Sequence, residues 1–234
     1  MIVFLGSQSA QTPLFAGQEN CFGSKDPGLF NMKGNLYFLP DGNEGMPEKL
    51  GEASSSGVIY TDHLDVPSRS FTEGFPGVTD RFEWFGLLYT GQFEVEKTGE
   101  YRWRLFSDDG SRLWIDGNEV IDNDGVHPGQ EKDGVVSLTR GPHSIKVWYF
   151  QGPADEIAIQ LFVTPPGGGE IIFSMKDFST NLGKEIEKVQ AKPTAEGIKV
   201  QLDAAVLFDT GKSIWKTAGS RSSFSPDSLL RSIS

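Results

Sequence analysis

The chain has 234 residues and 27 aromatic side chains (17 Phe, 5 Trp and 5 Tyr), enough to bury a hydrophobic core without a structural metal or disulfide. Its 32 acidic and 21 basic residues give a net charge of −11, which disfavours binding to nucleic acid or to anionic lipid. No apolar run approaches the roughly 18 residues that span a bilayer, so we expect no membrane insertion. Cys21 is the single cysteine and cannot form an internal disulfide.

Residues 1–29 form a stub before the first clear β pattern. The stub begins with the apolar run MIVFL and continues with small and polar residues through Ser9-Ala10-Gln11. This order is similar to the end of a signal peptide, but the apolar part is short and no basic residues precede it. Two interpretations stay open, the remnant of a signal peptide and an apolar lead-in strand.

Residues 30–165 carry the pattern of short β-strands and are expected to form one domain. Side chains alternate around residues 101–106, 145–150 and 157–163, as in strands that bury one face. Asp116-Gly117 separates two apolar stretches, which predicts a hairpin because glycine tolerates the positive φ of its turn. Several strands at this spacing predict an all-β fold, an antiparallel sandwich or barrel.

The composition changes in residues 166–234. Pro165-Pro166 followed by three glycines predicts a linker. Four apolar residues then recur at helical spacing, namely Phe178, Leu182, Ile186 and Val189. A strand pattern follows at residues 198–202, and the C-terminal residues are rich in serine. We therefore expect a linker, an amphipathic helix and a short helical or strand fragment of a truncated domain.

The sequence contains no recognisable catalytic motif. Gly211-Lys212-Ser213 lacks the preceding glycine of a phosphate-binding loop, since Val206 stands in its place. The three histidines fit no zinc spacing, and no pair of carboxylates is singled out for glycoside hydrolysis. We therefore expect that the chain is not an enzyme.

Ser107-Asp108-Asp109-Gly110-Ser111 stands between two predicted strands and carries two adjacent carboxylates. Their mutual repulsion should be offset by other contacts. The segment could form a turn, in which Asp and Gly are common, or the carboxylates could bind a hard cation. Calcium takes six to eight oxygen ligands from carboxylates, carbonyls and waters. Neighbouring strand side chains diverge, so both carboxylates reach one ion only where the backbone turns or the peptide bond is cis.

The segment SDDGSRLWIDGNEVIDNDGVH resembles the signature of the anthrax protective-antigen (PA-fourteen) domain, which is also found in yeast flocculins, bacterial adhesins and glycosidases. MKGNLYFLPDG resembles the opening strand of that domain. The stretch from GVIYTDHLDV to GLLYTGQFEV resembles the part before its central strands, and RGPHSIKVWYFQGPADEIAIQLFV resembles its last hairpin. The resemblance implies an antiparallel β-sandwich or barrel over residues 30–165.

The resemblance also implies calcium-dependent binding of carbohydrate. In many members of the family, two consecutive aspartates joined by a cis peptide hold calcium and contact sugar hydroxyls; here these are Asp108 and Asp109. The loop after residue 150 is expected to complete the site. Gln151 (side-chain oxygen) and Gly152 (carbonyl) are the candidate metal ligands there, and Gln151 and Asp155 are candidate sugar contacts.

Three other features near this signature have two interpretations each. Trp114 could stack on a pyranose face, but a strand tryptophan can equally belong to the core. The acidic stretch Asp122-Asn123-Asp124 could shape a turn or bind a second ion. His127 is interpreted as a surface or turn histidine.

A second resemblance concerns the C-terminal part. IKVQLDAAVLFDTGKSIWK is similar to the first strand and helix entry of the outer-membrane-protein-A-type peptidoglycan-binding domain. The residues with which that family holds peptidoglycan lie further along than this chain extends, so the similarity predicts a truncated domain start and no peptidoglycan binding. It points to a Gram-negative envelope.

The sequence therefore predicts a calcium-dependent, lectin- or adhesin-like module of a bacterial surface or envelope protein, with a cell-surface glycan or polysaccharide as its partner. The expected location is extracellular, or associated with the outer membrane or periplasm. Two alternatives stay open: a non-lectin structural or spacer domain of the envelope, and an accessory domain of a carbohydrate-active enzyme.

Overall fold

The structure, a computed structural model, describes residues 22–47, 50, 54–154, 156–180, 192–194 and 197–199. The regular structure in these residues is β-strand, and they contain no α-helix. The strands are β1 (Met32–Phe38), β2 (Gly57–Thr61), β3 (Asp65–Arg69), β4 (Phe85–Val95), β5 (Gly99–Asp108), β6 (Ser111–Ile115), β7 (Asn118–Asn123), β8 (Gln130–Leu138), β9 (Gly141–Gln151), β10 (Ile157–Thr164), β11 (Ile171–Ile172), β12 (Lys192–Thr194) and β13 (Gly197–Lys199).

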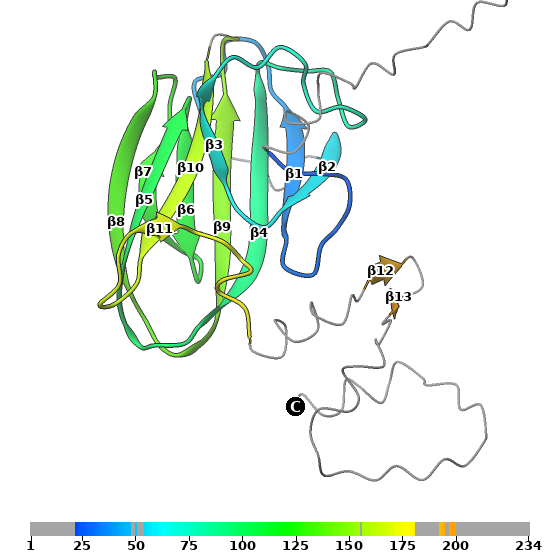
Figure 1. Cartoon of the computed structure of the whole chain (residues 1–234). Helices are drawn as coiled ribbons and strands as arrows, with labels where there is room; N and C mark the ends of the chain where they lie inside the picture. The colour runs from blue at the N-terminus through cyan, green and yellow to red at the C-terminus, as the bar shows by residue number, and fades with distance from the viewer. Residues whose placement is uncertain are drawn as a thin grey trace, which may run out of the picture. The chain divides into compact units, whose positions relative to one another are not determined.

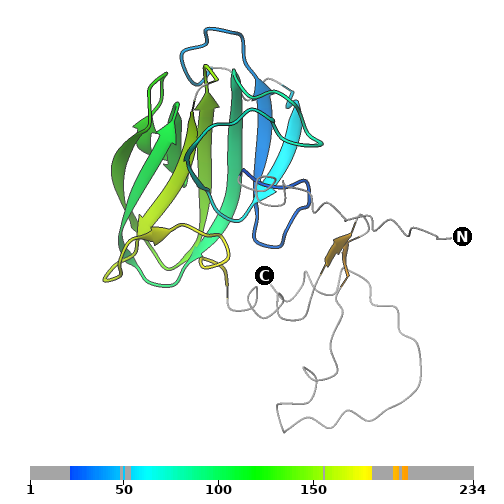
Figure 2. The same ribbon diagram turned by 45° about the horizontal axis from the view of Figure 1, so that its top comes forward.

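Two antiparallel sheets face one another as a sandwich (Figure 1). One has the strand order β2-β1-β4-β9-β6-β7, and the other has the order β11-β10-β5-β8 with β3 also pairing to β10. Figure 2 shows the same two layers from a tilted direction. The predicted all-β antiparallel sandwich is therefore confirmed.

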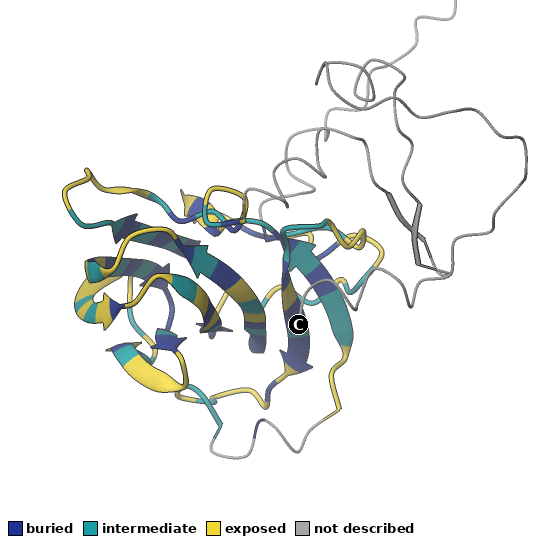
Figure 3. Ribbon diagram, turned by 90° about the horizontal axis from the view of Figure 1, so that it is seen from below, coloured by how far each residue is buried: buried dark blue, intermediate teal, exposed yellow. Residues whose placement is uncertain are grey.

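The core lies between the two sheets and is rich in aromatic rings. Trp103 from one sheet contacts Phe93 from the other, with ring centroids 5.9 Å apart in an edge-on arrangement. Such pairs add to the stabilisation that the burial of the rings provides. Figure 3 shows buried and exposed residues alternating along several strands, which is the period of two that the sequence carries. Phe22 and Phe173, outside the predicted span 30–165, also belong to this core.

A second, smaller hydrophobic cluster involves alternate residues of β9. Val147 and Tyr149 belong to the main core, whereas Trp148 and Phe150 pack with Leu39, Leu50 and other residues in this second cluster. Successive strand residues point to opposite faces, so both faces of β9 are buried here. Gly86 allows the ring of Trp148 to lie close, because a Cβ at Gly86 would overlap that ring.

The predicted hairpin at Asp116-Gly117 is present between β6 and β7. Asp116 has φ 51° and Gly117 has φ 78°, the two positive values that a type I′ turn requires. β8 follows this hairpin and pairs with β5 along its whole length. In the central pairing, β9 runs antiparallel to both β4 and β6. Its last residue, Gln151, pairs with Phe85 at the start of β4, and Tyr149 pairs with Ser111 at the start of β6.

The predictions for both ends of the chain fall largely outside the described residues. Residues 1–21, and Leu182, Ile186 and Val189 of the predicted helix, are not described. Phe178 lies in a turn and packs against the main core. Ile198 lies in β13, which pairs with β12, while the rest of the segment similar to the outer-membrane-protein-A type lies largely outside the described part. In the part of the chain that is described, no helix is long and apolar enough to cross a membrane.

Candidate functional site

Asp108 and Asp109 lie where the chain passes from one sheet of the sandwich to the other. Asp108 is the last residue of β5 and pairs with Ala158 of β10, and after Asp109 and Gly110 the chain enters β6 in the opposite sheet. The peptide bond between the two aspartates is cis, as the resemblance implied. The pair therefore lies between the end of β5 and the start of β6, and the two sheets of the sandwich fix its position.

Gly110 lets a neighbouring loop approach the aspartate pair. A Cβ at Gly110 would lie 2.7 Å from the backbone nitrogen of Gly125 and 2.8 Å from Asp124 Oδ1. Both distances are shorter than ordinary van der Waals contact, so the loop after β7 can pack here only against glycine. The carbonyl oxygen of Gly110 accepts a hydrogen bond from Phe150 N, which fixes the turn to β9.

The carboxylate of Asp109 is nearly covered, with 4% of the residue exposed, and accepts hydrogen bonds from both neighbouring loops. His127 N donates to Oδ1 at 3.0 Å. On the other side, Gly152 N donates to Oδ2 at 2.7 Å, and Gln151 Nε2 donates to the same oxygen at 3.3 Å. Three N–H donors stabilise the ionised form of this carboxyl group.

The electrostatic environment of Asp108 is different. The residue is 9% exposed, and burial together with the charge of Asp109 raises the pKa of its carboxyl group to about 6. The negative charge of Glu156 acts in the same direction, while a hydrogen bond from the Gly129 backbone and the charge of His127 oppose it. Asp108 is thus a carboxylate that a nearby cation would favour in its ionised form.

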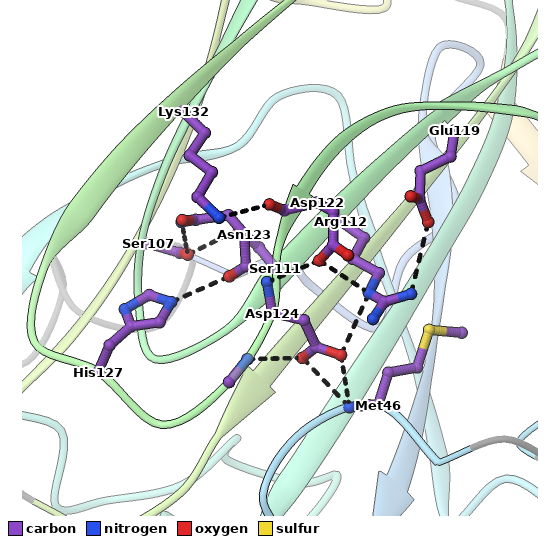
Figure 4. Close-up of polar contacts among 11 residues, drawn as sticks. Met46, Ser107, Ser111, Arg112, Glu119, Asp122, Asn123, Asp124, His127 and Lys132 are labelled. Carbon is purple, nitrogen blue, oxygen red and sulfur yellow. Dashed lines mark hydrogen bonds and ion pairs between the residues drawn. The ribbon is translucent and has the colours of Figure 1, made fainter.

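A buried polar network lies beside the aspartate pair. The hydroxyls of Ser107 and Ser111 are 2.6 Å apart, and Asn123 Nδ2 donates to Ser107 Oγ at 3.1 Å. Asn123 Oδ1 is buried and has no hydrogen-bond partner among the described residues. Figure 4 shows His127 reaching this network through its ring, whose Nε2 lies 2.9 Å from the carbonyl oxygen of Asn123.

The acidic stretch Asp122-Asn123-Asp124, at the end of β7, contacts an arginine. Arg112 Nε lies 3.2 Å from a carboxylate oxygen of Asp122 and 3.2 Å from one of Asp124 (Figure 4). Asp124 also accepts hydrogen bonds from the backbone nitrogens of Met46, at 2.9 Å, and Gly125, at 3.0 Å. Arg112 also pairs with Glu119, so its single charge is shared by three carboxylates. Together with the backbone N–H groups these contacts fix the turn, which favours the turn interpretation over a second ion.

The loop after β9 reaches the aspartate pair through nitrogen atoms rather than through the predicted oxygens. Gln151 Oε1 lies 2.6 Å from the hydroxyl of Tyr149, and the carbonyl oxygen of Gly152 accepts a hydrogen bond from Trp84 N at 3.1 Å. The structure therefore brings Gln151 and Gly152 to the pair, in contact with Asp109. Asp155 lies outside the described residues.

The structure does not bring Trp114 to the aspartate pair. Trp114 pairs with Lys146, three positions along β6 from the pairing of Ser111 with Tyr149. It belongs to the second hydrophobic cluster, and Lys146 Nζ lies over its ring, 3.9 Å from the centroid. One face of the indole is thereby in contact with an ammonium group, as in a cation–π pair.

The oxygen atoms around the pair fit a hard cation. Calcium is held by carboxylates and carbonyls, and a carboxylate oxygen can accept more than one contact. Besides the two aspartates, the carbonyl oxygens of Pro153 and Glu156 lie 3.0 and 3.3 Å from Gln151 Nε2, the atom that also contacts Asp109. The described residues contain no cluster of three or more His, Cys, Asp or Glu side chains, so any further ligands among the described residues would be neutral oxygens.

A family model described as the PA14 domain matches residues 57–174 of the chain. The fold is shared by solved structures, including the following three. The PA14 sugar-binding domain from an RTX adhesin is 21% identical, with a TM-score of 0.53, and the alignment covers 62% of this chain and 95% of that one. The PA14 domain of the MpAFP antifreeze protein is 14% identical, with a TM-score of 0.53 and coverage of 72% and 94%.

The third structure is an anti-sigma factor domain-containing protein, 21% identical, with a TM-score of 0.52, where the alignment covers 65% of this chain and 48% of the other. No curated protein matches the sequence. At these identities the structural likeness concerns the fold of the sandwich.

Proposed function

This chain belongs to the PA14 domain family, and we propose on that basis that its sandwich is a calcium-dependent carbohydrate-binding module of a bacterial surface or envelope protein. Asp108 and Asp109 would hold the ion, with neutral oxygens from the loop after β9. Bound calcium would supply positive charge and open positions for vicinal sugar hydroxyls. The two carboxylates would also accept hydrogen bonds from those hydroxyls.

The observation that carries this proposal is the burial of two adjacent carboxylates at one crossing between the sheets. Asp108 is 9% exposed and has no basic side chain as a hydrogen-bond partner in the described part, while its pKa is raised by burial and by Asp109. Buried carboxylates are normally paired or coordinate a metal. A cation between Asp108 and Asp109 would remove the repulsion, and the sugar-binding description of one structural neighbour agrees with this use.

The proposal is tested with a glycan array probed with the full chain in about 1 mM calcium, a concentration typical of extracellular sites, and again after chelation. We expect binding to a subset of glycans that disappears with the chelator and in Asp109→Asn. Asp122→Asn, which changes an exposed carboxylate on the neighbouring hairpin, should bind like the wild type. Glycan binding that persists in chelator would contradict the proposal.

One observation favours the alternative of a structural or spacer domain. Asp109 accepts N–H groups from His127, Gly152 and Gln151, so its carboxylate ties two loops to the sandwich without any ion. A spacer domain would show no glycan binding in either condition. We expect no catalysis by this chain, and a role as an accessory domain of a carbohydrate-active enzyme would require the catalytic residues in a separate domain.

A further inference from the structure

Trp84 has a backbone conformation that a bulky residue rarely adopts. It directly precedes β4, and its φ of 51° lies in the left-handed region that normally favours glycine. Two hydrogen bonds hold it there. Trp84 N donates to the carbonyl oxygen of Gly152 at 3.1 Å, and the carbonyl oxygen of Trp84 accepts from Leu39 N at 2.8 Å. Strained positions of this kind cluster at binding sites, which points to a role for the indole.

The loop that carries Trp84 is fastened on both sides. Arg81 Nε donates to the carbonyl oxygen of Glu83 at 2.9 Å, and Arg81 Nη2 donates to that of Leu39 at 2.8 Å. On the other side, Ala154 N donates to Glu83 Oε2 at 3.2 Å. The loop thus connects the end of β1 to the loop after β9. Its indole is held in place before any ligand binds, which lowers the entropic cost of a contact.

The loop of Trp84 lies next to the aspartate pair, with Gly152 between them. Gly152 N donates to Asp109 Oδ2 at 2.7 Å, while its carbonyl oxygen accepts from Trp84 N. A Cβ at Gly152 would lie 3.1 Å from Asp109 Oδ2 and 3.5 Å from Cζ of Phe150. The ring centroids of Phe150 and Trp84 are 6.5 Å apart. Gly152 adds no side chain to the space between the carboxylate and the two rings.

Trp84 also differs in burial from other tryptophans of the described part. Trp103 and Trp148 are completely buried, and the ring of Trp114 lies under Lys146. Trp84 is only half-buried, although it packs against the second hydrophobic cluster. Part of its indole therefore remains open to a ligand, and a flat apolar ring is a suitable surface for the apolar face of a pyranose.

We propose that Trp84 forms a second subsite, an apolar wall that packs against the sugar residue next to the one bound at Asp108 and Asp109. This inference rests on the proposed function and adds to it that the ligand is a disaccharide or a longer glycan. The carboxylate of Glu83, which Ala154 N holds in the same loop, would accept hydrogen bonds from hydroxyls of that second sugar. Trp84 does not touch the ion, so it determines glycan specificity and leaves calcium binding unchanged.

The test compares single sugars with disaccharides by calorimetry on the full chain in about 1 mM CaCl2. The probes are the methyl glycosides of glucose, galactose, mannose and fucose, and disaccharides that carry each of these sugars at the non-reducing end. We expect the wild type to bind at least one disaccharide about fivefold to tenfold more tightly than the matching methyl glycoside.

Trp84→Asn removes the ring, and asparagine tolerates the left-handed region better than other residues with a Cβ. This variant should lose the preference for the disaccharide. Its affinities for calcium and for the methyl glycoside should equal those of the wild type, which a loss of loop structure would not allow. Trp114→Phe is the control, and it should keep the preference.

A second readout uses the unchanged side-chain packing. The full chain is labelled with fluorinated tryptophan, and the ¹⁹F signal that is missing in Trp84→Phe identifies Trp84. We expect the disaccharide to shift this signal and the methyl glycoside to leave it in place. The signals of the buried Trp103 and Trp148 should not move with either sugar.

The outcomes separate this inference from the proposed function. If sugars bind in calcium but no disaccharide is preferred, or if Trp84→Asn keeps the preference, the subsite is wrong while the calcium-dependent module stands. Loss of calcium binding in Trp84→Asn would also contradict the subsite, because it would make Trp84 a positioning residue of the ion site. If no probe binds to the wild type in calcium, the proposed function is wrong and the subsite with it.

Discussion

The backbone nitrogen of His127 donates a hydrogen bond to Asp109 Oδ1 at 3.0 Å, although 18 positions separate the two residues. The imidazole of His127 contacts the backbone of its own loop on both sides. Nδ1 lies 2.9 Å from the carbonyl oxygen of Pro128, and Nε2 lies 2.9 Å from that of Asn123. The side chain of His127 therefore shapes the loop whose backbone fixes one oxygen of Asp109.

His127→Ala should weaken both the fold and the cation site. Removing two ring contacts to carbonyl oxygens should cost about 1–2 kcal/mol of unfolding free energy, measured with urea. The calcium affinity should fall as well, because Asp109 loses a fixed donor. His63→Ala removes a ring that contacts exposed Asp62 and serves as the control with unchanged affinity. A destabilised His127→Ala protein with wild-type calcium affinity would show that the loop does not position Asp109.

Gly110→Ala should damage the site through sterics alone. The new Cβ would lie 2.7 Å from Gly125 N and 2.8 Å from Asp124 Oδ1, so the loop or the aspartate turn must move. We expect a loss of about 1–3 kcal/mol in thermal or chemical unfolding, together with weaker calcium binding. Gly169→Ala is the matched control, since nothing lies within 4 Å of its Cβ position. Equal stability of the two variants would contradict the packing described for Gly110.

Stability should depend on pH through His143 and Asp116, which are 2.6 Å apart on the β6–β7 turn and β9. Burial opposes the charge of His143, but its hydrogen bonds to Asp116 and Thr139 outweigh burial and raise its pKa. Burial likewise opposes the charge of Asp116, but hydrogen bonds from His143 and Ser144 lower its pKa.

The sign of the pH effect follows from these directions. Protonated His143 stabilises the fold fully below its unfolded pKa of about 6.5, and this contribution is lost as pH rises through the raised folded value. The contribution of Asp116 is present above about pH 3.9 and is lost as pH falls through its lowered value. His143→Gln should therefore cost about 1 kcal/mol near pH 5.5 and less near pH 9, by melting in chelator. A difference that grows with pH would contradict the charged pair.

Trp114→Ala should lower the stability of the fold but leave sugar recognition unchanged. The indole belongs to the second hydrophobic cluster and lies under Lys146, so its removal should cost about 3–5 kcal/mol of stability. Calcium and glycan affinities of the folded variant should equal those of the wild type, because the residue does not contact the aspartate pair. If this substitution is too destabilising, Trp114→Phe tests the same point. A glycan affinity reduced in Trp114→Phe would place the indole in the sugar site.

Much of the sandwich could be predicted from local pattern. The alternation around residues 101–106 and the Asp116-Gly117 turn are local properties, and the structure has a strand and a hairpin there. Local pattern could not show that Trp148 and Phe150 are buried as well as Val147 and Tyr149. That burial depends on the distant segment that contains Leu39, Met46 and Leu50. Asp124 accepts a hydrogen bond from the backbone nitrogen of Met46 in that segment, 78 positions away.

The candidate site was predictable only in part for the same reason. Adjacent carboxylates between two strands, together with the family resemblance, single out Asp108 and Asp109. The contacts of Tyr149 with Asp108 and of His127 with Asp109 join residues 41 and 18 positions apart, and no spacing rule connects them. The contact of Gln151 with Asp109 likewise joins residues 42 positions apart and exists only once the loops are placed.

The central claim is tested most directly by a calorimetric titration of the full chain with CaCl2, with the wild type beside Asp108→Asn and Asp109→Asn. We expect binding to the wild type, none to either variant, and normal binding to Asp122→Asn. At about 100 times the dissociation constant, calcium should also add roughly 2.7 kcal/mol to the unfolding free energy of the wild type alone. Absence of calcium binding to the wild type would contradict the account. So would calcium binding to both aspartate variants as tight as to the wild type.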